Sequence, residues 1–71
     1  MTSFNYLELE IDNRNVATLW LNRPERNNAL NADFINELIT AFKQVSSNPD
    51  IRLLVIRGKG KHFCSGGDLQ W

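Results

Sequence analysis

Residues 50–69, DIRLLVIRGKGKHFCSGGDL, join a strongly apolar run to a loop of small residues. The run RLLVIRG, at 52–58, is unbroken between two arginines, which is typical of a strand that is apolar on both faces. Such a strand belongs in a sheet that is covered on both sides. The sequence GKGKHF then predicts a bend, and CSGGDL predicts a turn into a helix, at which small residues expose backbone N–H groups.

This glycine loop does not match the common phosphate-binding motifs. The dinucleotide fingerprint requires a glycine at the position of Phe63. A P-loop requires Gly-Lys-Ser/Thr after a four-residue gap, which follows neither Gly58 nor Gly60. Two interpretations remain for the exposed N–H groups. They stabilise negative charge on a carbonyl oxygen, or the turn has no ligand, and these residues alone leave both open.

The first 22 residues predict a β-hairpin. In FNYLELEID, residues 4–12, apolar and polar side chains alternate with the period of a half-buried strand. The sequence DNRN at 12–15 predicts a turn. VATLWLN at 16–22 is rich in strand-forming residues and predicts a second strand, which Pro24 ends. The short connection favours antiparallel pairing.

The period changes at residues 31–45, where apolar side chains fall at helical spacing on one broad face. Asn31 is the expected N-cap and Asp33 complements the helix dipole, whereas SSNPD at 46–50 ends the helix. The expected fold class is therefore α/β, with the element order β-β-α-β. One helix covers only one face of the sheet, so we expect the chain to be a piece of a longer protein or to pair with another copy.

Composition narrows the choice of partner and compartment. Eight basic and eight acidic side chains give no net charge, which argues against nucleic acid and against an anionic membrane surface. The single cysteine excludes an internal disulfide and favours a reducing compartment. The amino terminus lacks the pattern of a signal peptide, and no window reaches the roughly 18 apolar residues of a membrane span. We expect a cytoplasmic location.

The titratable and nucleophilic side chains give no catalytic group on their own. His62 has no partner at metal spacing, so no metal site is predicted. Cys64 follows an apolar residue and is interpreted as a small buried thiol. Trp20 is expected to pack in the core or in an interface. Four carboxylates are interpreted as solvated charges: Glu8, Glu10, Glu25 and Glu37.

Three stretches, taken in order, resemble one family. VATLWLNRPERNNALN at 16–31, the amphipathic helix and the 50–69 stretch are similar to the amino-terminal part of the crotonase superfamily, also called the enoyl-CoA hydratase/isomerase family. The resemblance implies a spiral of β-β-α units, the ClpP/crotonase fold, with residues 1–71 as the amino-terminal fragment of a single domain. It also implies an acyl-CoA thioester as substrate and an enolate that two backbone N–H groups hold.

The resemblance places one of these two donors at the backbone N–H of Gly67, where the family commonly has alanine. It also implies main-chain contacts to coenzyme A from two segments. Their residues are Arg26, Asn27, Ala29, Ser65, Gly66, Gly67, Asp68, Leu69 and Gln70. Coenzyme A is then part of the substrate, and no separate cofactor is expected.

The remaining parts of such a site fall outside this chain. In the family's hydratases the second donor and two acid/base glutamates lie on later segments, so the 71 residues alone are predicted to be inactive. The resemblance also implies that the full-length protein is a homo-oligomer, either a trimer or a hexamer. The ending GDLQW is similar to methylglutaconyl-CoA hydratases. The alternative is a truncated, non-catalytic chain that only self-associates or binds coenzyme A weakly.

Overall fold

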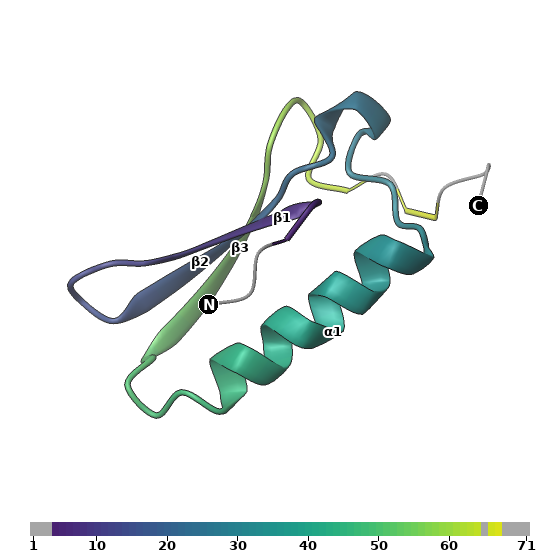
Figure 1. Cartoon of the computed structure of the whole chain (residues 1–71). Helices are drawn as coiled ribbons and strands as arrows, with labels where there is room; N and C mark the ends of the chain where they lie inside the picture. Colours follow the sequence, from purple (N-terminus) through teal and green to yellow (C-terminus); the bar gives the residue numbers. More distant parts are fainter. Residues whose placement is uncertain (1–3, 65, 68–71) are drawn as a thin grey trace.

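The computed structural model describes residues 4–64, 66 and 67, and it has the predicted order of elements (Figure 1). A 3-10 turn that the sequence analysis did not predict follows the hairpin. The elements are β1 (Leu7–Ile11), β2 (Val16–Leu21), η1 (Pro24–Arg26), α1 (Ala32–Ser46) and β3 (Leu53–Gly58). No helix in the described ranges is both long enough and apolar enough to span a membrane.

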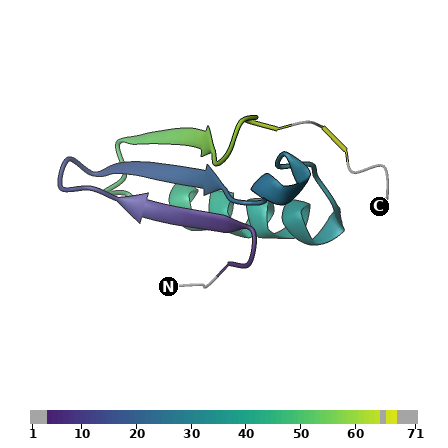
Figure 2. The same ribbon diagram turned by 90° about the horizontal axis from the view of Figure 1, so that it is seen from above.

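The three strands form one sheet in the order β1-β2-β3, with β2 in the centre. β1 pairs antiparallel with β2, and Leu7 lies opposite Leu21, which confirms the hairpin. β2 pairs parallel with β3, in a register that starts with Val16 opposite Leu53. Because parallel neighbours need a crossover, α1 lies between them in sequence and packs across one face of the sheet (Figures 1 and 2).

The core lies between α1 and this face of the sheet. It contains Leu7, Leu19, Leu21, Phe34 and Ala41, all buried. Strand residues two apart point to the same face, so alternate positions of β1 and β2 supply the sheet side of this core. The side chain of Asn31 accepts a 2.9 Å hydrogen bond from the Phe34 N–H, and this confirms the predicted N-cap.

The opposite face of the sheet is not covered within residues 4–64, 66 and 67. Leu53 is 58% exposed at the start of β3, in line with the prediction that one helix cannot cover a strand apolar on both faces. Trp20 lies on this face, half-buried, rather than in the core. Cations lie over its ring, Arg57 at 4.6 Å and Lys59 at 5.1 Å from the ring centroid.

Two carboxylates that were interpreted as solvated charges have partners in the fold. Glu8 is exposed, as expected, whereas the interpretation is wrong for the half-buried Glu37. Glu8 forms a 2.8 Å ion pair with Lys59 and thereby links β1 to the end of β3. Glu37 is half-buried on α1 and accepts hydrogen bonds from the backbone N–H groups of Asn5 and Tyr6. It thus fastens the segment before β1 to the helix.

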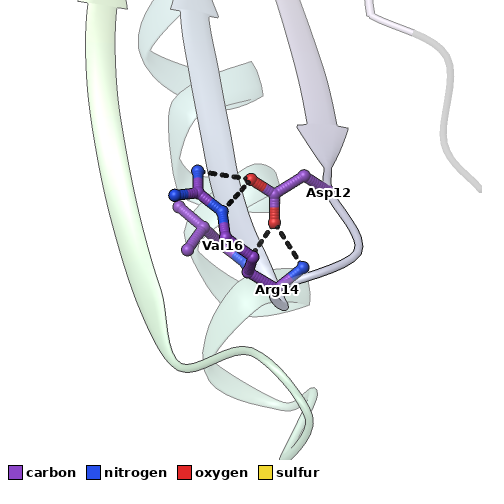
Figure 3. Close-up of polar contacts among 3 residues, drawn as sticks. All are labelled: Asp12, Arg14 and Val16. Carbon is purple, nitrogen blue, oxygen red and sulfur yellow. Dashed lines mark hydrogen bonds and ion pairs between the residues drawn. The ribbon is translucent and has the colours of Figure 1, made fainter.

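The turn between β1 and β2 is organised by the carboxylate of Asp12 (Figure 3). One oxygen accepts hydrogen bonds from the N–H groups of Arg14 and Val16, at 2.8 and 3.1 Å. The other accepts two bonds from the Arg14 guanidinium. The hydrogen bond from the Arg14 side chain, followed by that from Val16, lowers the pKa of Asp12 below its ordinary value of 3.8.

We therefore predict that Asp12 stabilises the chain in a pH-dependent way. A depressed folded pKa means that this stabilisation is fully present above the unfolded pKa of about 4 and is lost as the pH falls through the lower, folded value. Asp12→Asn keeps an acceptor for the backbone N–H groups but removes the charge. The difference in urea midpoint between the wild-type chain and this variant should shrink between pH 6 and pH 2. A difference that stays constant over this range would contradict the prediction.

Candidate functional site

Two loops meet at the edge of the sheet where β2 and β3 end. The first runs from residue 22 to residue 30 and contains η1, and the second runs from residue 59 to residue 67. Carboxyl ends of parallel strands lie at the same edge, which is why these loops are neighbours although they are far apart in sequence. Figure 1 shows the second loop, in green to yellow, beside η1.

The first loop is held by its own backbone. The N–H of Asn27 donates to the Pro24 carbonyl, and the N–H of Asn28 donates to the Arg23 carbonyl at 2.8 Å. Asn27 and Asn28 are both left-handed, with φ of 52° and 56°, a conformation that asparagine tolerates better than most residues. The chain therefore coils tightly before it enters α1.

The side chain of Asn28 joins the two loops. It is completely buried, with 0% exposure. Its Oδ1 accepts a 2.8 Å hydrogen bond from the Arg23 N–H. Its Nδ2 donates to the carbonyls of Lys59 and His62, at 2.9 and 2.8 Å. A buried amide must be satisfied in this way, because leaving its polar atoms unpaired costs about 1–3 kcal/mol per group.

A main-chain hydrogen bond joins the ends of the two loops. The Leu30 N–H donates to the Gly66 carbonyl at 2.7 Å, and Leu30 forms an isolated parallel bridge with Gly67. The donor of this bond is Leu30, so the Gly67 N–H is not used in it. Within the described part of the chain, no acceptor is bonded to the Gly67 N–H. Among the described residues, this backbone donor is therefore available at the place where the two loops converge.

The structure brings together the two segments that the sequence analysis predicted to bind coenzyme A. Arg26 is half-buried in η1, Asn27 is exposed and Ala29 is buried. Gly66 and Gly67 are exposed next to Leu30. The other predicted contacts, at Ser65, Asp68, Leu69 and Gln70, lie outside the described residues. The helix expected to start in CSGGDL also falls mainly outside them.

Two residues near this convergence were missed or only partly understood from sequence. The role of the Asn28 side chain was not predicted, although two adjacent asparagines before an apolar residue signal left-handed backbone. Cys64 is half-buried and packs against the core rather than being fully buried, and its Sγ lies 3.4 Å from the Gly66 nitrogen, which donates to it. In the described part of the chain, no three His, Cys, Asp or Glu side chains form a metal-binding group.

The fold and these loops define an α/β protein whose candidate site is built mainly from backbone at the carboxyl edge of parallel strands. The sequence model described as "Enoyl-CoA hydratase/isomerase" matches residues 11–71. The chain belongs to the enoyl-CoA hydratase/isomerase family. This confirms the family resemblance and the α/β fold class.

Solved structures and curated proteins agree with this membership. A crystal structure of an enoyl-CoA hydratase/isomerase from Mycobacterium paratuberculosis matches 96% of the chain at 40% identity, with a TM-score of 0.89. The peroxisomal Delta(3,5)-Delta(2,4)-dienoyl-CoA isomerase of Arabidopsis thaliana is 44% identical over 73 residues. The 1,2-epoxyphenylacetyl-CoA isomerase of Escherichia coli is 45% identical over 56 residues.

The chain is much shorter than these proteins. The match to the Arabidopsis isomerase includes 97% of the chain but 26% of the isomerase. The match to the Escherichia coli isomerase includes 79% of the chain and 21% of the isomerase, and the mycobacterial structure is matched over 26% of its length. The chain therefore spans about a quarter of the length of the relatives that it matches.

The closeness of the loops yields a prediction about Gly58, the last residue of β3. A Cβ at this position would lie 2.6 Å from the Phe63 carbonyl oxygen and 3.0 Å from Asn28 Nδ2. Gly58→Ala should therefore destabilise the chain by about 1–3 kcal/mol, the usual cost of overpacking. Urea unfolding of the 71-residue chain measures this.

Gly67→Ala is the matched control for stability. A Cβ there meets no atom of residues 4–64 within 4 Å, and the φ of Gly67 lies outside the left-handed region. Its free energy of unfolding should stay within about 0.5 kcal/mol of the wild-type value. Equal effects of the two substitutions would show that the loops do not approach as closely as described.

Proposed function

We propose that this chain supplies half of an enolate-stabilising acyl-CoA site. In this proposal, the backbone N–H of Gly67 donates a hydrogen bond to the thioester carbonyl oxygen, and main chain of residues 26–29 and 65–70 contacts coenzyme A. The observation that supports it best is the convergence of these two segments at the Leu30–Gly67 bridge, which leaves the Gly67 N–H without an acceptor among the described residues.

Such a donor acts on charge that develops during the reaction. When a proton leaves the carbon beside a thioester, or when a nucleophile adds to its conjugated double bond, negative charge moves to the carbonyl oxygen. A fixed N–H group stabilises this charge more than it stabilises the neutral ground state, so it lowers the barrier. Removing one donor of this kind costs about 100-fold or more in kcat.

For a protein of the length of its relatives, we propose hydration of an enoyl-CoA, with water adding its oxygen to the β-carbon and a proton to the α-carbon. The GDLQW ending supports a methylglutaconyl-CoA-like substrate. We also propose a homo-oligomer and a cytoplasmic location for that protein. The acid/base groups of the reaction are expected on segments outside these 71 residues.

A second candidate reaction is isomerisation of a dienoyl-CoA, which moves a proton from one carbon to another. It is favoured by relatives that match nearly the whole chain, the Delta(3,5)-Delta(2,4)-dienoyl-CoA isomerases of Arabidopsis thaliana and Mus musculus, at 44% and 38% identity. The two reactions differ in their products, because hydration adds one water and isomerisation leaves the mass unchanged. Mass spectrometry of the products from a relative-length protein carrying this segment separates them.

The role of Gly67 is testable on the 71-residue chain with acetyl-CoA that carries carbon-13 at the thioester carbonyl. Hydrogen bonding from Gly67 should move the carbonyl signal downfield upon binding. Gly67→Pro removes the N–H without removing the Leu30 donor, so it should abolish this displacement, whereas Gly67→Ala keeps the N–H and should retain it. An unchanged displacement in Gly67→Pro would refute the proposed donor.

We further predict that the 71-residue chain does not turn over an enoyl-CoA, because one backbone donor does not move protons. The measurement is the absorbance of crotonyl-CoA and of methylglutaconyl-CoA incubated with the purified chain. Hydration above the rate without protein, lost in Gly67→Pro, would overturn this prediction.

A further inference from the structure

The Asn28 carboxamide differs from the other groups near the candidate site because it has no exposed surface. Its hydrogen bonds run to backbone atoms of Arg23, Lys59 and His62. Its influence on a ligand is therefore indirect and acts through the main chain that it holds.

The direction of these hydrogen bonds fixes the orientation of the amide. Oδ1 faces an N–H of its own loop, whereas both protons of Nδ2 are donated to carbonyls of the other loop. A flipped amide would place an oxygen against two carbonyl oxygens and a donor against a donor, which is strongly disfavoured. The observed arrangement of the two loops thus uses both donors of this amide and gives its oxygen a partner.

Asn28 is also close in sequence to the main-chain hydrogen bond that joins the two loops beside Gly67. Two residues after Asn28, the Leu30 N–H binds the Gly66 carbonyl, and four residues before Gly66, the His62 carbonyl binds Asn28. The two cross-links therefore lie close together, at residues 28 and 30 of one loop and at residues 62 and 66 of the other. Short closed segments have few conformations, so one cross-link restricts the other.

From this geometry we infer that Asn28 is a positioning residue: its amide sets the register of residues 28–30 against residues 62–67 and thereby the direction of the Gly67 N–H. This inference rests on the proposed function for its catalytic meaning. The positioning itself is measurable without any ligand.

Two variants remove the cross-link while keeping the backbone conformation accessible. Asn28→Gly accepts the φ of 56° and deletes only the side chain. Asn28→Asp keeps the acceptor for the Arg23 N–H but loses both donors. The control is Asn15→Gly, a change of the same kind at an exposed left-handed residue, with φ of 62°, in the turn before β2.

In nitrogen-15 spectra of the 71-residue chain, both Asn28 variants should displace the Gly67 amide signal and speed hydrogen exchange at Leu30 by about tenfold or more. The signals of the β1–β2 hairpin should stay in place, and Asn15→Gly should match the wild-type chain at Leu30 and Gly67. The inference would be overturned if both Asn28 variants kept the wild-type exchange rate at Leu30 and the wild-type position of the Gly67 amide signal.

If the variants do not fold, a hydrogen-exchange measurement on the wild-type chain still tests the positioning role of Asn28. The side-chain NH2 protons of Asn28 and the Leu30 amide proton should exchange with the same protection, because they open as one unit. Exchange of the Asn28 protons at the rate of a free asparagine amide, with Leu30 still protected, would overturn the inference independently of any variant.

The carbonyl signal of bound carbon-13 acetyl-CoA then distinguishes a failure of the positioning role of Asn28 from a failure of the proposed function. At saturating ligand, Asn28→Gly should reduce the carbonyl displacement by about half or more, whereas Asn15→Gly should retain it. If the wild-type chain binds without any displacement, the proposed function fails, and the ligand-free exchange data still decide the positioning. A full displacement in Asn28→Gly would refute the positioning role while supporting Gly67 as the donor.

Discussion

The arrangement of the candidate site depends on one buried carboxamide. The Asn28 side chain has 0% exposure. Its oxygen accepts a hydrogen bond from one loop, and its Nδ2 donates two hydrogen bonds to the other. Leaving a buried amide without hydrogen-bond partners is costly, so this side chain favours the register in which the two loops meet. Gly58 lies in the same tightly packed region, because a Cβ on it would clash with the Phe63 backbone and crowd Asn28 Nδ2. The Leu30–Gly67 bridge lies at the end of this tightly packed region.

The sheet explains why these loops are available to each other. β2 and β3 run parallel, and α1 returns the chain to the start of β3, so both strands end at one edge. The core beneath α1 anchors this arrangement through Phe34 and Leu19, which are fully buried. In the proposed site the reactive donor is a backbone N–H. Its direction is set by the fold, and substitutions that preserve the register preserve the chemistry.

Much of this architecture could be predicted because it depends on local patterns. Alternation predicted the hairpin, the change to helical spacing predicted α1, and Asn31 was identified as its N-cap. The roles of Glu8 and Glu37 were not predictable, since their partners are 51 and 31 or 32 residues away in sequence and become neighbours only in the folded chain. Asn28 was missed for the same reason. Its partners at Lys59 and His62 are backbone carbonyls, which carry no sequence signal.

The sequence by itself determined the elements, the cap and the family, because each follows from side-chain periodicity or from motifs such as LNRPE and FCSGGDL. It also indicated Gly67, through the motif alone. Only the tertiary structure decided that residues 26–30 and 66–67 lie side by side, that β2 and β3 are parallel, and that Asn28 joins the loops. The physical reason is that hydrogen bonds between backbone atoms distant in sequence depend on register, and register is set by the packing of the whole sheet and helix.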